Sequence, residues 1–279
     1  MKLALATHTP EVSHPPAVAL LSGTFAERLE KAQRLGFDGL ELMAARPAEL
    51  DAAGLRAGLQ AHGLEAAAVA SGPVFMQDGL TLLASSDEVS RQAAARLDGL
   101  IDLAMALEAP VVTIGSFRGR LAWTNDSGAR DALRDRLLAA AERAAAGGVR
   151  LALEPLNRYE TDLVQNVSEG LQFLAESSHP NLGLLLDTFH MNIEEADILS
   201  ALARVQAAGK LFHIHLGDSN RLPPGQGHFN FAALARALDK NGYSGFLSAE
   251  LCPWPDPDTA AALTIGHMRQ WIKLEQAGK

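Results

Sequence analysis

The chain alternates short apolar runs with longer amphipathic segments from one end to the other. This alternation is typical of repeated strand and helix units built around a parallel sheet. The pattern predicts strands over 2–6, 38–42, 64–70, 110–115, 150–154, 182–187, 211–216 and 246–250. It predicts that the following helices begin near Thr24, Ala48, Ser86, Asp126, Ser168, Ile198, Phe231 and Asp258.

Local signals at the ends of the helices support the same division. Glycines stand where each of four helices must stop, at Gly36, Gly147-Gly148, Gly209 and Gly242. The string Ser85-Ser86-Asp87-Glu88 opens an alanine-rich stretch that is the longest predicted helix, with Ser or Asp available as its N-cap. The connections 71–85 and 216–230 are predicted to be long loops, and such loops roof the active site of a barrel.

The number of strand and helix units and the length of the chain agree with one fold class. The chain has 279 residues, close to the roughly 250 residues of an eightfold barrel. No low-complexity linker or charge block divides it. We therefore expect residues 1–279 to form a single (β/α)8 TIM barrel domain.

Charge and cysteine content narrow the possible partners and location. The net charge of −9 disfavours nucleic acid as a partner, because phosphate backbones are bound mainly by Lys and Arg. The lone Cys252 cannot form an internal disulfide, and the run Leu3-Ala4-Leu5-Ala6 is too short for the core of a signal peptide. No apolar stretch approaches the roughly 18 residues that span a bilayer. We expect a cytoplasmic protein without membrane insertion.

Four strands in the second half end in side chains that can bind a metal. They supply Glu154, Asp187, the pair His213 and His215, and Glu250. An ionised carboxylate at the tip of a buried strand is costly unless it is paired or bound to a cation, so a shared site at one face of the barrel is the better explanation. The oxygen-rich set suits Mn²⁺, Mg²⁺ or Co²⁺, and one divalent ion there could take a carbonyl and a neighbouring hydroxyl of a substrate.

Longer strings around these residues resemble a known family. They are EPLNRYET at 154–161, LDTFHMNIEE at 186–195, HIH at 213–215, NRLPPGQGH at 220–228, and, more weakly, Gly72-Pro73 and LASSDE at 83–88. The strings resemble the ketose 3-epimerases of the tagatose and psicose 3-epimerase type, within the xylose-isomerase-like barrel and sugar phosphate isomerase/epimerase superfamily. The resemblance spans most of the chain.

The resemblance implies a role for each matching residue. Metal ligation falls to Glu154, Asp187, His215 and Glu250, with Mn²⁺ the expected ion, and substrate contacts fall to Glu160, His190 and Arg221. Glu154 and Glu250 would also exchange protons on opposite faces of the substrate, inverting C3 of a ketose or ketose phosphate through a cis-enediolate. The resemblance also implies a small-molecule sugar substrate and a homo-oligomer.

Several alternatives remain open from the sequence. An aldose-ketose or hydroxypyruvate-type isomerase could use the same metal site, and a metal-dependent endonuclease or an inactive barrel would be more distant readings. Asp187 could be only a helix N-cap and His190 only a polar core residue. Arg118 and Arg120 could clamp a phosphate or carboxylate of an acidic substrate, or could be solvated loop residues.

Overall fold

The computed structural model describes residues 1–84, 86–124 and 126–276, and its eight parallel strands form a closed barrel in chain order. The barrel closes where β8 pairs with β1, with Lys2 opposite Phe246. The predicted (β/α)8 barrel is therefore confirmed. The strands are β1 (Lys2–His8), β2 (Gly39–Met43), β3 (Glu65–Ala70), β4 (Val111–Ile114), β5 (Arg150–Leu153), β6 (Leu182–Asp187), β7 (Leu211–Leu216) and β8 (Phe246–Ala249).

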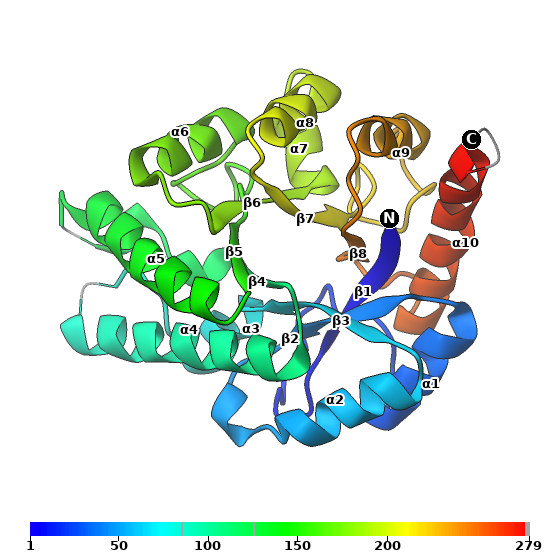
Figure 1. The fold of residues 1–279 in the computed structure, drawn as a ribbon, viewed down its shortest axis with the longest axis horizontal. Coiled ribbons are helices and arrows are strands. Elements are labelled where there is room, and N and C mark those ends of the chain that lie inside the picture. The colour runs from blue at the N-terminus through cyan, green and yellow to red at the C-terminus, as the bar shows by residue number, and fades with distance from the viewer. Residues whose placement is uncertain (85, 125, 277–279) are drawn as a thin grey trace.

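Helices surround the barrel as a ring, and the first and last helices lie side by side (Figure 1). The α-helices are α1 (Phe25–Leu35), α2 (Ala52–Ala61), α3 (Gly72–Asp78), α4 (Asp87–Leu107), α5 (Ala129–Ala146), α6 (Val167–Ser177), α7 (Thr188–Glu194), α8 (Ile198–Ala207), α9 (Phe231–Lys240) and α10 (Pro257–Gln276). Three short 3₁₀ turns are η1 (Pro47–Glu49), η2 (Ser116–Arg118) and η3 (Leu121–Trp123). None of the described helices is long and apolar enough to cross a membrane.

The period of two along each strand separates two environments. In β6, Leu182, Leu184 and Leu186 pack into the large core that lies between the strands and the helices. Leu185 and Asp187 alternate with them and point into the barrel, where Leu185 joins a smaller apolar cluster formed by strand residues alone. In β6 the inward-pointing position at the carboxyl end is therefore occupied by the polar Asp187.

Capping residues lie at the ends of α1 and α4, at the positions that the sequence predicts. Thr24 and Glu27 form a reciprocal capping box at the start of α1, and Gly36 ends that helix with φ 85°, a conformation that is costly for other residues. Ser86 caps α4, the longest helix of the described residues, while Ser85, the other serine considered as N-cap, lies outside them.

Two predictions about local structure are wrong, and one short helix was missed. Segment 71–85 is not simply a loop, because Gly72–Asp78 forms α3, with Pro73 in its first turn. Helix α2 begins at Ala52 rather than near Ala48, because the 3₁₀ turn η1 precedes it and Asp51 supplies the cap. Helix α7 directly after β6 was not predicted. The segment 217–230 is a loop, as expected.

Candidate metal and active site

The four predicted metal ligands meet at the carboxyl ends of four consecutive strands. Asp187 is the last residue of β6, His215 is the fifth of the six residues of β7, and Glu154 and Glu250 come directly after β5 and β8. One ligand atom from each residue lies within 4.8 Å of the others. Residues separated by 96 positions in the chain are thus brought to one point by the closure of the barrel.

Buried atoms without partners point to a cation at this place. Glu154 Oε1, Asp187 Oδ2 and His215 Nδ1 are all buried and have no hydrogen-bond partner among the described residues. The Nδ1 atom of His215 lies 3.5 Å from Glu154 Oε1 and 3.6 Å from Glu250 Oε2, too far for good hydrogen bonds. Three carboxylates and an imidazole nitrogen are a hard, oxygen-rich donor set, so these residues fit a divalent ion such as Mn²⁺.

Asp187 has two structural roles that the sequence presented as alternatives. Its Oδ1 atom accepts a 2.7 Å hydrogen bond from the backbone N–H of Phe189 and caps α7. Its Oδ2 atom is left free and lies in the ligand cluster. The cap thus fixes the orientation of the carboxylate and leaves one oxygen for the cluster.

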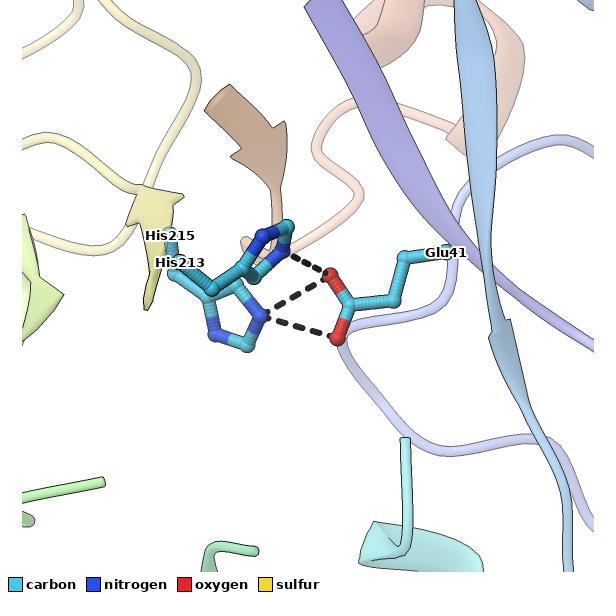
Figure 2. Close-up of side chains that lie close together, drawn as sticks. All are labelled: Glu41, His213 and His215. Carbon is cyan, nitrogen blue, oxygen red and sulfur yellow. Dashed lines mark hydrogen bonds and ion pairs between the residues drawn. The ribbon is translucent and has the colours of Figure 1, made fainter. Parts of the chain in front are cut away.

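Glu41, a residue that no sequence motif singled out, contacts His213 and the proposed ligand His215 (Figure 2). Its carboxylate is fully buried in the barrel and lies 2.9 Å from His213 Nε2 and 3.0 Å from His215 Nε2. The signal in the sequence was an acidic residue in the middle of an apolar strand, between Leu40 and Leu42. His213 is buried and lies 2.9 Å from Glu41, so it fills the barrel beside the four proposed ligands.

The three predicted substrate contacts also gather here. The Nη1 and Nη2 atoms of Arg221 donate to Glu160 Oε1 at 3.2 Å and to Glu250 Oε2 at 3.1 Å. His190 lies just behind the cluster, with Nε2 3.9 Å from Glu154 Oε1. The Nδ2 atom of Asn157 lies 2.7 Å from His190 Nδ1 and donates to it, which places the imidazole proton on Nε2.

Five of the site residues line a cavity of about 220 Å³, namely Glu154, Glu160, His215, Arg221 and Glu250, whereas Asp187 and His190 lie outside its lining. Arg221 is the one Lys or Arg side chain among the described residues that line it. Apolar side chains from the segments after β1 and β3 also line it, among them Pro16, Val18 and Met76. The lining residues are Pro16, Ala17, Val18, Met43, Ala70, Gly72, Met76, Thr113, Gly115, Ser116, Glu154, Leu156, Glu160, His215, Arg221 and Glu250.

The pKa values of the two glutamates in the cluster shift in opposite directions. Burial raises the pKa of Glu250, and the negative charges of Glu154 and Asp187 raise it further. Burial also raises the pKa of Glu154, but His215 and His190 lower it below its ordinary value. Burial lowers the pKa of His215, but the carboxylates of Glu41 and Glu250 raise it well above its usual range. A nitrogen in this field attracts a proton or a metal ion.

The two arginines of the fourth loop are not equivalent. Arg118 is neither a clamp in the mouth nor a solvated residue, because it is fully buried and donates to the backbone carbonyls of Glu154 and Val164. Arg120 is partly exposed and donates to the Tyr159 carbonyl at 3.2 Å. It lines a neighbouring recess with Trp123, outside the cavity that holds the cluster.

Residues 29–271 match the sequence family of the xylose isomerase-like TIM barrel. The chain belongs to this family. The barrel is similar in sequence to an L-ribulose 3-epimerase of Mesorhizobium japonicum, with 34% identity over 80% of this chain and 73% of the relative. A ketose 3-epimerase of Arthrobacter globiformis is 29% identical over 78% of this chain and 74% of the relative.

Solved structures of related epimerases are also similar to this xylose isomerase-like barrel. A structure of D-psicose 3-epimerase with D-tagatose, from Clostridium cellulolyticum H10, has a TM-score of 0.81 at 25% identity over 98% of this chain and 99% of that chain. An AP endonuclease of family 2 from Brucella melitensis, with a TM-score of 0.77 at 20% identity over 93% of this chain and 96% of that chain, shares the fold alone. With these epimerase relatives, the chain is an enzyme of the isomerase class.

Proposed function

We propose that this chain is a divalent-metal-dependent ketose 3-epimerase. The observation that carries the proposal is the placement of Glu154 and Glu250, which approach His215 Nδ1 at 3.5 and 3.6 Å from β5 and β8. These strands are separated by β6 and β7 in the closed barrel, so the two carboxylates reach the cavity from different sides. The names of the relatives at 34% and 29% identity support the same activity.

The proposed ligands are Glu154, Asp187, His215 and Glu250, and the expected ion is Mn²⁺. When bound, such a cation supplies Lewis-acid stabilisation for the oxygens at C2 and C3 of the sugar. The unpartnered buried oxygens of Glu154 and Asp187 support this assignment, because burying them without a partner is costly.

The glutamates would move the proton at C3. One ionised glutamate removes it, and the electrons of the C–H bond form a C2–C3 double bond while the C2 carbonyl becomes the oxygen of a cis-enediolate. The other glutamate, protonated at the start, then delivers its proton to the opposite face of C3. The reverse reaction uses the two glutamates in exchanged roles.

Three further side chains would hold the substrate. The Nε2–H of His190 has no acceptor in the part of the chain that the structure describes and would donate to a sugar oxygen. Arg221 bridges Glu160 and Glu250, so it would keep the proton-transferring carboxylate in place while Glu160 accepts from a hydroxyl. A cavity with Arg221 as its one Lys or Arg among the described residues favours a free ketose over a ketose phosphate.

Solvent isotope exchange tests the proposal. In deuterated water with Mg²⁺ or Mn²⁺, a ketose substrate should acquire deuterium at C3 together with its C3 epimer, as measured by mass spectrometry and by NMR after removal of the metal. Both signals should be lost in Glu154→Gln and Glu250→Gln and kept in Glu142→Gln, whose carboxylate is 83% exposed. Deuterium at C1 or C2 with aldose formation would contradict the proposal and indicate an isomerase.

Three broader expectations remain proposals beside this one. We propose that residues 1–279 act as one barrel domain and that the enzyme works in the cytoplasm. We also propose a homo-oligomer, which sedimentation of the purified chain would test.

A further inference from the structure

We propose that Glu41 is a positioning residue for the metal site. It holds the His215 ring with its proton on Nε2, so that the lone pair of Nδ1 faces Glu154, Asp187 and Glu250. The inference rests on the proposed function only in taking this cluster as a cation site.

The hydrogen-bond geometry assigns the tautomer of His215. Its Nε2 atom lies 3.0 Å from both carboxylate oxygens of Glu41, within the range of direct hydrogen bonds (Figure 2). A carboxylate can only accept, so Nε2 must carry the proton. In the neutral ring, Nδ1 then has a free lone pair. This atom is buried in the cluster of carboxylates and has no hydrogen-bond partner among the described residues.

Glu41 is itself held rigidly by groups from the facing strands. His213 Nε2 lies 2.9 Å from its Oε2 atom, and Thr113 donates to Oε1 at 3.3 Å. These partners come from β7 and β4, neither of which is next to β2 in the barrel. Glu41 therefore connects β2 to His215 across the interior of the barrel, between strands that share no backbone hydrogen bonds.

Glu41 does not take part in substrate contact. The side chain has no exposed surface and does not line the cavity, and both of its carboxylate oxygens are already bonded to His213, His215 or Thr113. Any effect of Glu41 on the reaction must pass through His215. A hydrogen bond from a ligating histidine to a carboxylate orients the ring and strengthens it as a ligand.

The same three residues could alternatively hold a second cation, since Glu41, His213 and His215 also converge. The separations of 2.9 and 3.0 Å are those of direct hydrogen bonds. A cation among them would also require His215 Nε2 to lose its proton while Nδ1 serves the main cluster. The geometry therefore favours one cation and a hydrogen-bonded support.

The test replaces Glu41 by glutamine and measures metal binding. Glutamine keeps the shape but offers one acceptor oxygen, and its amide N–H groups oppose a histidine N–H. Titration of Mn²⁺ into the metal-free full chain should show a Kd that is roughly 10- to 100-fold weaker in Glu41→Gln. The matched control is Glu65→Gln, on neighbouring β3, whose side chain is 55% exposed and should leave the Kd unchanged.

A second readout reports the histidine itself. Nitrogen-15 NMR of the metal-free chain, at a pH high enough for a neutral ring, should show His215 as the Nε2–H tautomer in the wild type and a shifted equilibrium in Glu41→Gln. This signal also separates the two hypotheses: a wild type that binds no divalent ion would refute the proposed metal site, while the tautomer would still test Glu41. If Glu41→Gln does not fold, His213→Gln, which removes one support of Glu41 but keeps its carboxylate, should give a smaller loss of Mn²⁺ affinity and leave His215 as the Nε2–H tautomer.

Two results would overturn the inference. One is an unchanged Kd and an unchanged tautomer in a folded Glu41→Gln chain. The other is two bound ions per wild-type chain with one lost in Glu41→Gln, because Glu41 would then be a ligand.

Discussion

Arg221 donates a 3.1 Å hydrogen bond from Nη2 to Oε2 of Glu250, the carboxylate that follows β8. The same guanidinium reaches Glu160 through Nη1 and lies over the ring of Phe189. One planar group thus fixes two carboxylates of the proposed site, a geometry that an ammonium group cannot reproduce.

We therefore expect Arg221→Lys to lower kcat/KM for a ketose by roughly 10- to 100-fold, the equivalent of a lost charge-assisted hydrogen bond. Steady-state epimerisation rates would measure it. The control is Arg158→Lys, which also breaks an arginine–glutamate pair, with Glu194, but lies outside the described lining of the cavity. Equal losses in the two variants would argue against a special role of Arg221.

Arg118 should matter for stability far more than Arg120. Replacing the buried Arg118 by Met leaves the carbonyls of Glu154 and Val164 without their donor, so the free energy of unfolding should fall by about 2–4 kcal/mol. Arg120→Met, two residues further in the same loop, should change it by no more than about 0.5 kcal/mol. Denaturant unfolding of both variants measures the difference, and similar values would contradict the assigned burial.

Phosphorylated sugars should be poor substrates. The cavity wall carries the carboxylates of Glu154, Glu160 and Glu250, and the one described Lys or Arg on it, Arg221, is already paired with two of them. A phosphate there meets net repulsion, so kcat/KM for a free ketose should exceed that for its phosphate ester by at least roughly tenfold. If the ester is preferred, Arg120→Ala should raise its KM, since Arg120 lines the adjacent recess.

Metal removal should destabilise the chain. Mn²⁺ at about 100 times its Kd should raise the free energy of unfolding by about 2.7 kcal/mol, or roughly 5–10 °C in Tm. Asp187→Asn should abolish this shift, because asparagine can still cap α7 but supplies no charge to the cluster. Thermal unfolding with Mn²⁺ and with a chelator tests it. A full Mn²⁺ shift in Asp187→Asn would exclude Asp187 as a ligand.

His8 should make the stability depend on pH on the acid side. Burial, together with the nearby Arg28 guanidinium, lowers the pKa of His8 to about 4. The unfolded chain, in which histidine has its ordinary pKa of about 6.5, therefore binds more protons than the native chain between these values. The contribution of His8 to the free energy of unfolding is therefore complete above pH 6.5 and is lost as the pH drops toward 4. His8→Asn should flatten this part of the Tm profile, whereas His14→Asn, at an exposed position, should follow the wild type.

The predicted order of strands and the positions of the ligands could be read from local pattern. Apolar runs such as Leu184-Leu185-Leu186 reveal strands because burial on both faces selects apolar residues in a row. Asp187 directly after that run reveals a strand end, and in a parallel barrel all strand ends of one kind share a face. The capping box of Thr24 and Glu27 is likewise a local interaction that needs no tertiary context.

Contacts across the interior of the barrel could not be predicted from local sequence patterns. Glu41 meets His215 over a separation of 174 positions, and nothing near Glu41 in the sequence marks its partner. Arg118 looked like a loop residue because two glycines flank Ser116–Arg118, yet folding buries it under Glu154. The sequence shows which side chains end each strand, because that depends on neighbours along the chain. Which buried groups pair with one another depends on how the closed barrel brings distant strands together, and that information exists only in the folded protein.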